Sequence, residues 1–134
     1  MKKIIPIFLV IFLFVGTFLS GCKKDEEKLA NSWRINQYYE NGTDKTADAQ
    51  SVFNGYNLII DKNKSYSIYY RFLGLIDNYE SGTWAFSNKN KNVTFQKSNT
   101  SSTTEWTILK LMEDELWGEF QDSSKTIEVH LLPK

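Results

Sequence analysis

The residue types that most often carry catalysis or hold metals are scarce in this sequence. His130 is the single histidine and Cys22 the single cysteine among 134 residues. A zinc site built from His and Cys lacks ligands. A Ser-His-Asp triad would have to use His130, and no nucleophile-elbow sequence is present to supply its serine. We therefore predict a protein that is not an enzyme and that carries no cofactor.

The position of His130 in its segment also speaks against a catalytic role. Ile127, Val129 and Leu131 alternate with Thr126, Glu128 and His130. Side chains along a strand point to opposite faces in turn, so the apolar set faces the core and His130 faces the solvent. We predict a surface histidine.

Two groups of acidic residues could hold a cation, and neither has the full pattern. Asp61-x-Asn63-x-Ser65 begins like a calcium loop, but Tyr66 and Phe72 stand where Gly and Glu are needed. The cluster Glu113-Asp114-Glu115, even with Asp122, is favoured as a solvated turn. We predict no metal site.

The beginning of the chain has the pattern of an export signal. Lys2 and Lys3 precede a run of 16 mostly apolar residues from Ile4 to Leu19. Leu19-Ser20-Gly21-Cys22 then resembles the bacterial lipobox. That resemblance implies cleavage before Cys22, a diacylglycerol on its thiol and an acylated amino terminus. We expect residues 1–21 to be a lipoprotein signal peptide and Cys22 to be the lipid attachment site, which makes the membrane a partner.

The six charged residues that follow, Lys23 to Lys28, predict a short solvated tether over residues 22–28. Asp25-Glu26-Glu27 resembles the surface-export tag of Bacteroidota lipoproteins. We expect attachment to the bacterial outer membrane, with the surface-exposed side and the periplasmic side as alternatives. Without residues 1–21 the chain keeps 14 basic and 16 acidic residues. Its net charge of −2 offers no basic field for nucleic acid.

Short apolar runs with period two, separated by turn residues, predict an all-β domain over residues 29–134. Eight strands with such short links favour an antiparallel up-and-down meander closed into a barrel, with a sandwich as the alternative. A single helical turn is expected near Thr46 to Phe53. The eight predicted strands are Ser32–Glu40, Tyr56–Asp61, Ser65–Phe72, Gly82–Ser87, Asn92–Gln96, Thr104–Leu111, Glu115–Gln121 and Lys125–Leu132.

The alternation also sorts inner from outer residues. Tyr66, Tyr70, Trp84 and Phe86 lie on inner faces and, together with Trp33, are candidates to line the core or a cavity. Such large rings predict a mostly filled barrel with at most a shallow cavity at its mouth. Tyr69 and Trp117 are candidates for contact at the outer surface. In the sixth predicted strand, either of two alternating sets of side chains could face the core, and a bulge would resolve this conflict.

The domain resembles the lipocalin-like domain of small Bacteroidota lipoproteins. Leu29-x-x-Ser32-Trp33, Gly82-Thr83-Trp84 and Leu116-Trp117-Gly118 carry the resemblance. It implies that Trp33 packs at the bottom of the barrel, and it leaves Asn31 where the family usually has Gly. The expected function is binding of a small apolar ligand or a glycan. The alternative is a protein-interaction module, such as an inhibitor of an exported enzyme or a subunit of a surface complex.

Overall fold

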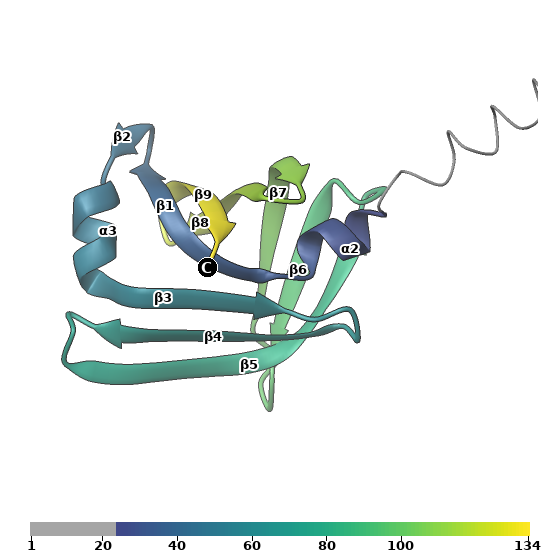
Figure 1. The fold of residues 1–134 in the computed structure, drawn as a ribbon, viewed down its shortest axis with the longest axis horizontal. Helices are drawn as coiled ribbons and strands as arrows, with labels where there is room; N and C mark the ends of the chain where they lie inside the picture. Colours follow the sequence, from purple (N-terminus) through teal and green to yellow (C-terminus); the bar gives the residue numbers. More distant parts are fainter. Residues whose placement is uncertain (1–23) are drawn as a thin grey trace, which may run out of the picture.

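The strands of the computed structural model, which describes residues 24–134, follow one another around a barrel (Figure 1). Two short helices accompany them. The helices are α2 (Asp25–Leu29) and α3 (Thr46–Val52). The strands are β1 (Ser32–Glu40), β2 (Thr43–Asp44), β3 (Phe53–Ile60), β4 (Ser65–Phe72), β5 (Ile76–Ser87), β6 (Asn92–Lys97), β7 (Thr103–Met112), β8 (Glu115–Asp122) and β9 (Lys125–Pro133).

Every pairing in the sheet is antiparallel, and the last strand returns to the first. The order is β1-β3-β4-β5-β6-β7-β8-β9, with β9 paired to β1 from Trp33 to Glu40. Two-residue strand β2 pairs with the end of β1 and lies outside this circuit. The prediction of an eight-stranded up-and-down barrel is confirmed. Closure pairs the edges of the sheet, except along most of the junction between β1 and β3.

Of the eight strand pairings that close the barrel, the one between β1 and β3 has the fewest paired residues. These strands pair only at Ser32 with Ile59 and at Trp33 with Leu58. Farther along, α3 occupies the space between them and packs on both. Its first residues also satisfy the β1 backbone, because Tyr38 accepts a hydrogen bond from the Lys45 amide at 2.8 Å. The helical turn expected near Thr46 is therefore present and covers this opening.

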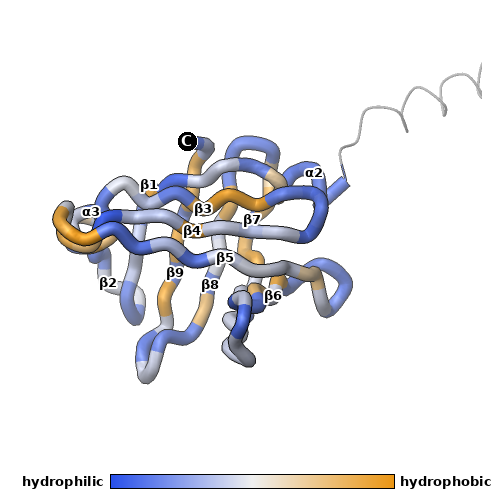
Figure 2. Tube along the Cα trace, turned by 90° about the horizontal axis from the view of Figure 1, so that it is seen from below, coloured by the Kyte–Doolittle hydropathy of each residue, from blue (hydrophilic) through white to orange (hydrophobic). Residues whose placement is uncertain are grey.

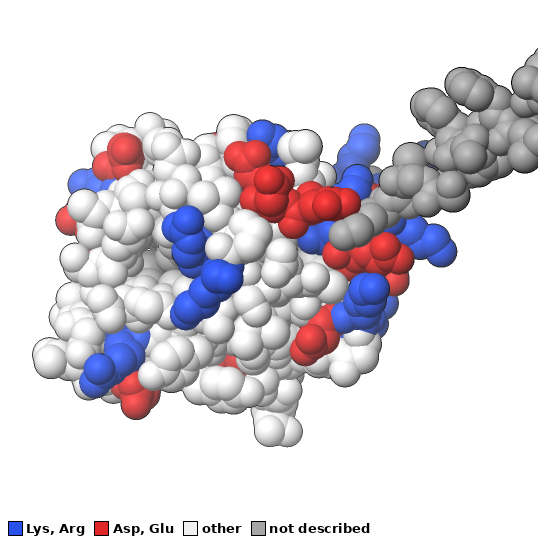
Figure 3. Space-filling view, viewed as in Figure 1, with Lys and Arg blue, Asp and Glu red and all other residues white. Residues whose placement is uncertain are grey.

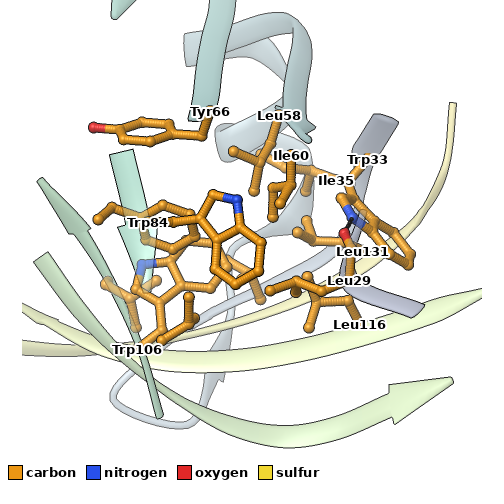
Figure 4. Packing of buried hydrophobic residues seen from close by; sticks show 14 of the residues in the cluster. Leu29, Trp33, Ile35, Leu58, Ile60, Tyr66, Trp84, Trp106, Leu116 and Leu131 are labelled. Atoms are coloured by element: carbon orange, nitrogen blue, oxygen red, sulfur yellow. Dashed lines mark hydrogen bonds between the residues drawn. The ribbon is translucent and has the colours of Figure 1, made fainter. Parts of the chain in front are cut away.

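One end of the barrel is filled solid. Helix α2 lies across it and buries Leu29 completely, and the Trp33 indole nitrogen donates to the Leu29 carbonyl at 2.9 Å. Figure 4 shows aliphatic side chains packed between Trp33 and Trp84. We call this the packed end. Its fully buried side chains include Leu29, Trp33, Ile60, Trp84, Val93 and Leu116.

A bulge changes the inward-facing set along β7. Its pairing with β8 shifts register between Ile108 and Lys110. Trp106 and Ile108 point inward before the shift and Leu111 packs on the core after it, whereas Leu109 is exposed. The two alternating sets of the sequence are therefore both used, on either side of the bulge.

Two elements differ from the prediction. Residues 25–29 form helix α2, where a charged tether was expected up to residue 28. Lys64 accounts for part of this, because its ammonium pairs with Glu26 and holds the helix to the β3–β4 turn. Strand β5 begins at Ile76, well before Gly82. Neither helix of the described part reaches the length and hydropathy that a membrane-spanning helix needs.

Candidate functional site

The end of the barrel opposite α2 is hollow. A cavity of about 200 Å³ lies there, beneath the ends of β1 and β8 and the beginnings of β3 and β9. Its wall is apolar except for the phenols and one carboxylate at the rim. The lining residues are Ile35, Tyr38, Phe53, Tyr56, Trp106, Phe120, Asp122, Val129 and Leu131. We call it the mouth cavity.

A second cavity of about 190 Å³ lies beside it, against β3 to β7. We call it the inner cavity. Tyr56, Trp106 and Phe120 line both cavities, so they lie between them. The remaining lining residues are Leu58, Ile68, Glu80, Phe95 and Thr104.

The partition between the cavities is a stacked pair of rings. Trp106 and Phe120 lie parallel, with centroids 5.1 Å apart and planes 9° apart. Gly118 makes room for the indole, because a methyl group at this position would collide with the Trp106 ring. Phe120 is only partly buried, whereas Trp106 belongs to the buried core.

Aromatic contacts also build the mouth. The Phe53 ring meets Tyr38, Tyr56 and Tyr70 with centroid distances of 6.0, 6.4 and 5.2 Å. Tilted and edge-to-face arrangements such as these hold large side chains in place without filling the space in front of them. The arrangement gives a mostly aromatic rim.

Glu80 is the charged side chain of the inner cavity. It points inward from β5, and the Tyr66 hydroxyl donates to its Oε2 at 2.8 Å. Burial and the hydrogen bond to Glu80 raise the pKa of Tyr66. Burial, and then the charge of Glu80, raises the pKa of Tyr56. Both phenols therefore stay protonated and remain hydrogen-bond donors at neutral pH.

The five side chains expected to line the core or a cavity lie around these cavities but not in their walls. Trp33, Tyr66 and Trp84 are buried in the packed core, Tyr70 and Phe86 are half-buried, and none of the five lines either cavity. The expectation of a mostly filled barrel with a shallow mouth is wrong. Trp33 and Trp84 fill the packed end, whereas the rings at the other end, such as Tyr38, Phe53 and Tyr56, stand around a cavity.

Of the two surface candidates, Tyr69 is accessible and Trp117 is largely occupied. Tyr69 is 40% exposed beside its cross-strand neighbour Tyr79 and donates a hydrogen bond to Asp77. The Trp117 ring stacks on His130 at 3.8 Å, and the Lys110 ammonium lies 4.8 Å from its centre. A sugar could not stack on the face that His130 covers.

The prediction of a solvent-facing His130 is wrong. The residue is on the outer face, as the alternation indicated, but it is only 8% exposed. Trp117 covers the imidazole, and its ring nitrogens lie 2.8 Å from Gln37 Oε1 and 2.6 Å from Glu128 Oε2. Glu128 lies on the same strand, but neighbouring strands supply Gln37 and the covering Trp117, which no pattern within one strand can show.

Sequence reasoning missed the residues that define the cavities. Tyr56, Glu80 and Phe120 were not singled out. The available signal was the alternation in β8, which places Phe120 on the same face as Leu116 and Gly118. Cys22 lies outside the described residues. Within residues 24–134, no three His, Cys, Asp or Glu side chains come together as metal ligands do.

A separate apolar surface lies at the β4–β5 turn. Six of the eight large hydrophobic side chains that are exposed in the described chain belong to this hairpin. Figure 2 shows the turn as an orange loop beside α3. We call it the hairpin patch. Its residues are Tyr69, Phe72, Leu73, Leu75, Ile76 and Tyr79.

Comparison with known proteins supports the fold. No protein-family model and no curated protein sequence matches this chain. Among solved structures, the chain is similar to a lipocalin-like protein from Bacteroides uniformis, with a TM-score of 0.60 and 11% sequence identity. The match covers 80% of this chain and 99% of that protein. The barrel is therefore lipocalin-like in architecture.

Proposed function

We propose that this protein binds a small apolar ligand in the hollow half of its barrel and does not act as an enzyme. The two adjoining cavities carry the proposal. Ligand pockets are concave, mostly apolar and lined by aromatic side chains with a few polar groups, with volumes of roughly 300–1,000 Å³. Together the mouth and inner cavities reach the lower end of that range. They suit a ligand of modest size.

We also propose that the protein is held at the outer membrane through a lipid on Cys22. Two lysines separate Cys22 from Asp25, where α2 begins at the packed end. A lipid at Cys22 would hold the packed end next to the bilayer. Charged side chains crowd around this end of the molecule (Figure 3), which suits a position at the lipid headgroups. The cavities would then open on the side away from the membrane.

Titration with N-phenyl-1-naphthylamine, a neutral dye that fluoresces in apolar surroundings, tests ligand binding. The test variant is Val129→Phe, because Val129 lines the mouth cavity and the larger ring would fill it. We expect at least tenfold weaker dye binding, which corresponds to about 1.4 kcal/mol. The matched control is Leu109→Phe on the outer surface, which should bind like the parent. Equal dye affinity in the parent and in a folded Val129→Phe variant would place the dye outside the cavities and overturn the proposal.

The hairpin patch favours a second candidate function, contact with a protein partner. Contiguous exposed apolar surface marks interaction sites in soluble domains. Leu75, at the tip of the hairpin, is 77% exposed. Replacing Leu73 and Leu75 with Ser should leave dye affinity unchanged. If the patch binds a partner, the same change should remove a crosslinked complex that the parent forms on intact cells.

A further inference from the structure

We infer that the ligand carries an amine, and that Glu80 receives this group inside the barrel. The inference rests on the proposed binding function and names the ligand class. The mouth cavity is mostly apolar and the inner cavity has a mixed wall, and the charged residues among their lining side chains are Glu80 and Asp122. No lining residue of either cavity is a Lys, Arg or His. The site therefore complements a cation and opposes an anion.

Glu80 is positioned by the barrel and not by chance. It lies two residues before Gly82 on the inward face of β5, opposite Ile68 of β4. Tyr66 stands beside it, because Gly82 has no side chain to displace the Tyr66 ring. Within residues 24–134 the Tyr66 hydroxyl provides the one hydrogen bond to this carboxylate. An ionised carboxylate can accept about four, so Glu80, which lines the inner cavity, can accept further hydrogen bonds from a ligand there.

The surroundings of Glu80 decide which ligand stabilises it. A charge next to an apolar wall is costly unless it is paired and hydrogen-bonded. An ammonium group would supply both the opposite charge and up to three donors. A hydroxyl would supply one donor without charge, and a carboxylate would add repulsion. We therefore expect affinity to decrease from an amine to an alcohol to an acid of the same chain length.

Two basic residues near the mouth cavity, Arg34 and Lys134, do not change the expected order of ligand affinities. Arg34 and Lys134 line a groove between β1 and β3 that is distinct from the two cavities but shares Ile35, Phe53 and Tyr56 with the mouth cavity. The Lys134 ammonium already donates to the Gly55 carbonyl at 3.3 Å. An acid bound from this groove would be the opposite result, and the experiment includes it.

Three ligands with the same chain test the inference: decylamine, decanol and decanoate, each displacing N-phenyl-1-naphthylamine at pH 7.5. We expect decylamine to bind roughly tenfold or more tightly than decanoate, since a hydrogen bond to a charged group is worth that much. Glu80→Gln should reduce this preference to within about twofold while decanol affinity stays the same. Glu105→Gln, on the outer surface, is the matched control and should keep the preference.

The outcomes of this comparison distinguish the role of Glu80 from the proposed binding function. Equal affinities of the parent for amine and alcohol, or a preference that survives Glu80→Gln, would overturn the role of Glu80 and leave apolar binding intact. Tighter binding of decanoate would overturn the inference in favour of the Arg34 groove. Failure of the dye and all three ligands to bind would overturn the proposed function itself. If Glu80→Gln does not fold, the comparison of the three ligands on the parent chain still decides.

Discussion

The indole of Trp84 is held by three different interactions at the packed end. Its ring nitrogen donates to the Asp61 carbonyl at 2.8 Å, and the Lys64 ammonium lies 4.2 Å from the ring centre. The Phe86 ring meets it edge-on at 5.2 Å. A ring with contacts of these three kinds fixes the β3–β4 turn against β5 as well as filling volume.

Trp84→Ala should therefore unfold the protein or lower its melting temperature sharply. Trp84 is only 2% exposed, and truncation of a buried Trp costs about 3–5 kcal/mol. A domain of this size has about 5–15 kcal/mol in total. Tyr69→Ala, at an exposed position, should cost much less. Denaturant unfolding of both variants measures the difference, and parent-like stability of Trp84→Ala would show that the ring does not support the core.

The raised pKa of Tyr56 should make the free energy of unfolding depend on pH in the alkaline range. Burial, and then the charge of Glu80, raises its pKa above the ordinary value of 10.0. Above pH 10 the unfolded chain releases this proton before the folded protein does, so the free energy of unfolding falls as pH rises. Below that pH both states keep the proton and the effect vanishes. Tyr56→Phe should flatten the decline in unfolding free energy between about pH 9 and 11.

The control for this titration is Tyr79→Phe. Tyr79 is 70% exposed, so its replacement should leave the pH dependence unchanged. Urea unfolding at several pH values measures the slope. A Tyr56→Phe variant with the parent's slope would mean that the Tyr56 phenol is as hydrated in the folded protein as in the unfolded chain.

At the scale of elements, α2 belongs to the barrel and is more than a spacer. Leu29 is fully buried under Trp33, and Leu→Ala changes in cores cost about 2–5 kcal/mol. We expect Leu29→Ala to lower the melting temperature markedly in a chain that begins at Lys24. Glu26→Ala removes only an exposed ion pair with Lys64 and should change stability little. Equal melting temperatures for the two variants would reduce α2 to a tether.

The strands that could be predicted from sequence are those whose inner face is apolar. Val93 and Phe95 in β6, or Ile127, Val129 and Leu131 in β9, alternate with polar residues because their inner side chains are buried in the barrel. The first half of β5 reverses this pattern. Asn78 and Glu80 face inward toward the hollow half, whereas Tyr79 faces out. Its strand signal was lost because a cavity accepts polar inner residues, and Glu80 was missed for the same reason.

At the scale of the whole molecule, helix α2, which follows the proposed anchor in the sequence, and the cavities lie at opposite ends. Cys22→Ser should abolish lipid attachment and leave either an unprocessed precursor or a protein that partitions into buffer. Partitioning between detergent and aqueous phases, with the parent as control, measures this. A Cys22→Ser protein that still enters the detergent phase would be anchored by something other than a lipid on this thiol.

The scarcity of pairing between β1 and β3 makes the barrel compliant along one seam. Seven of the eight strand junctions are long ladders, and their hydrogen bonds fix the distance between neighbouring strands. At the eighth junction the spacing beyond Trp33 depends on how α3 docks. The distance between β1 and β3 can therefore change there without breaking the hydrogen bonds of the seven longer pairings. A guest wider than the resting mouth would enter by displacing one short helix, and amide protons of α3 should exchange with solvent long before those of β8 and β9.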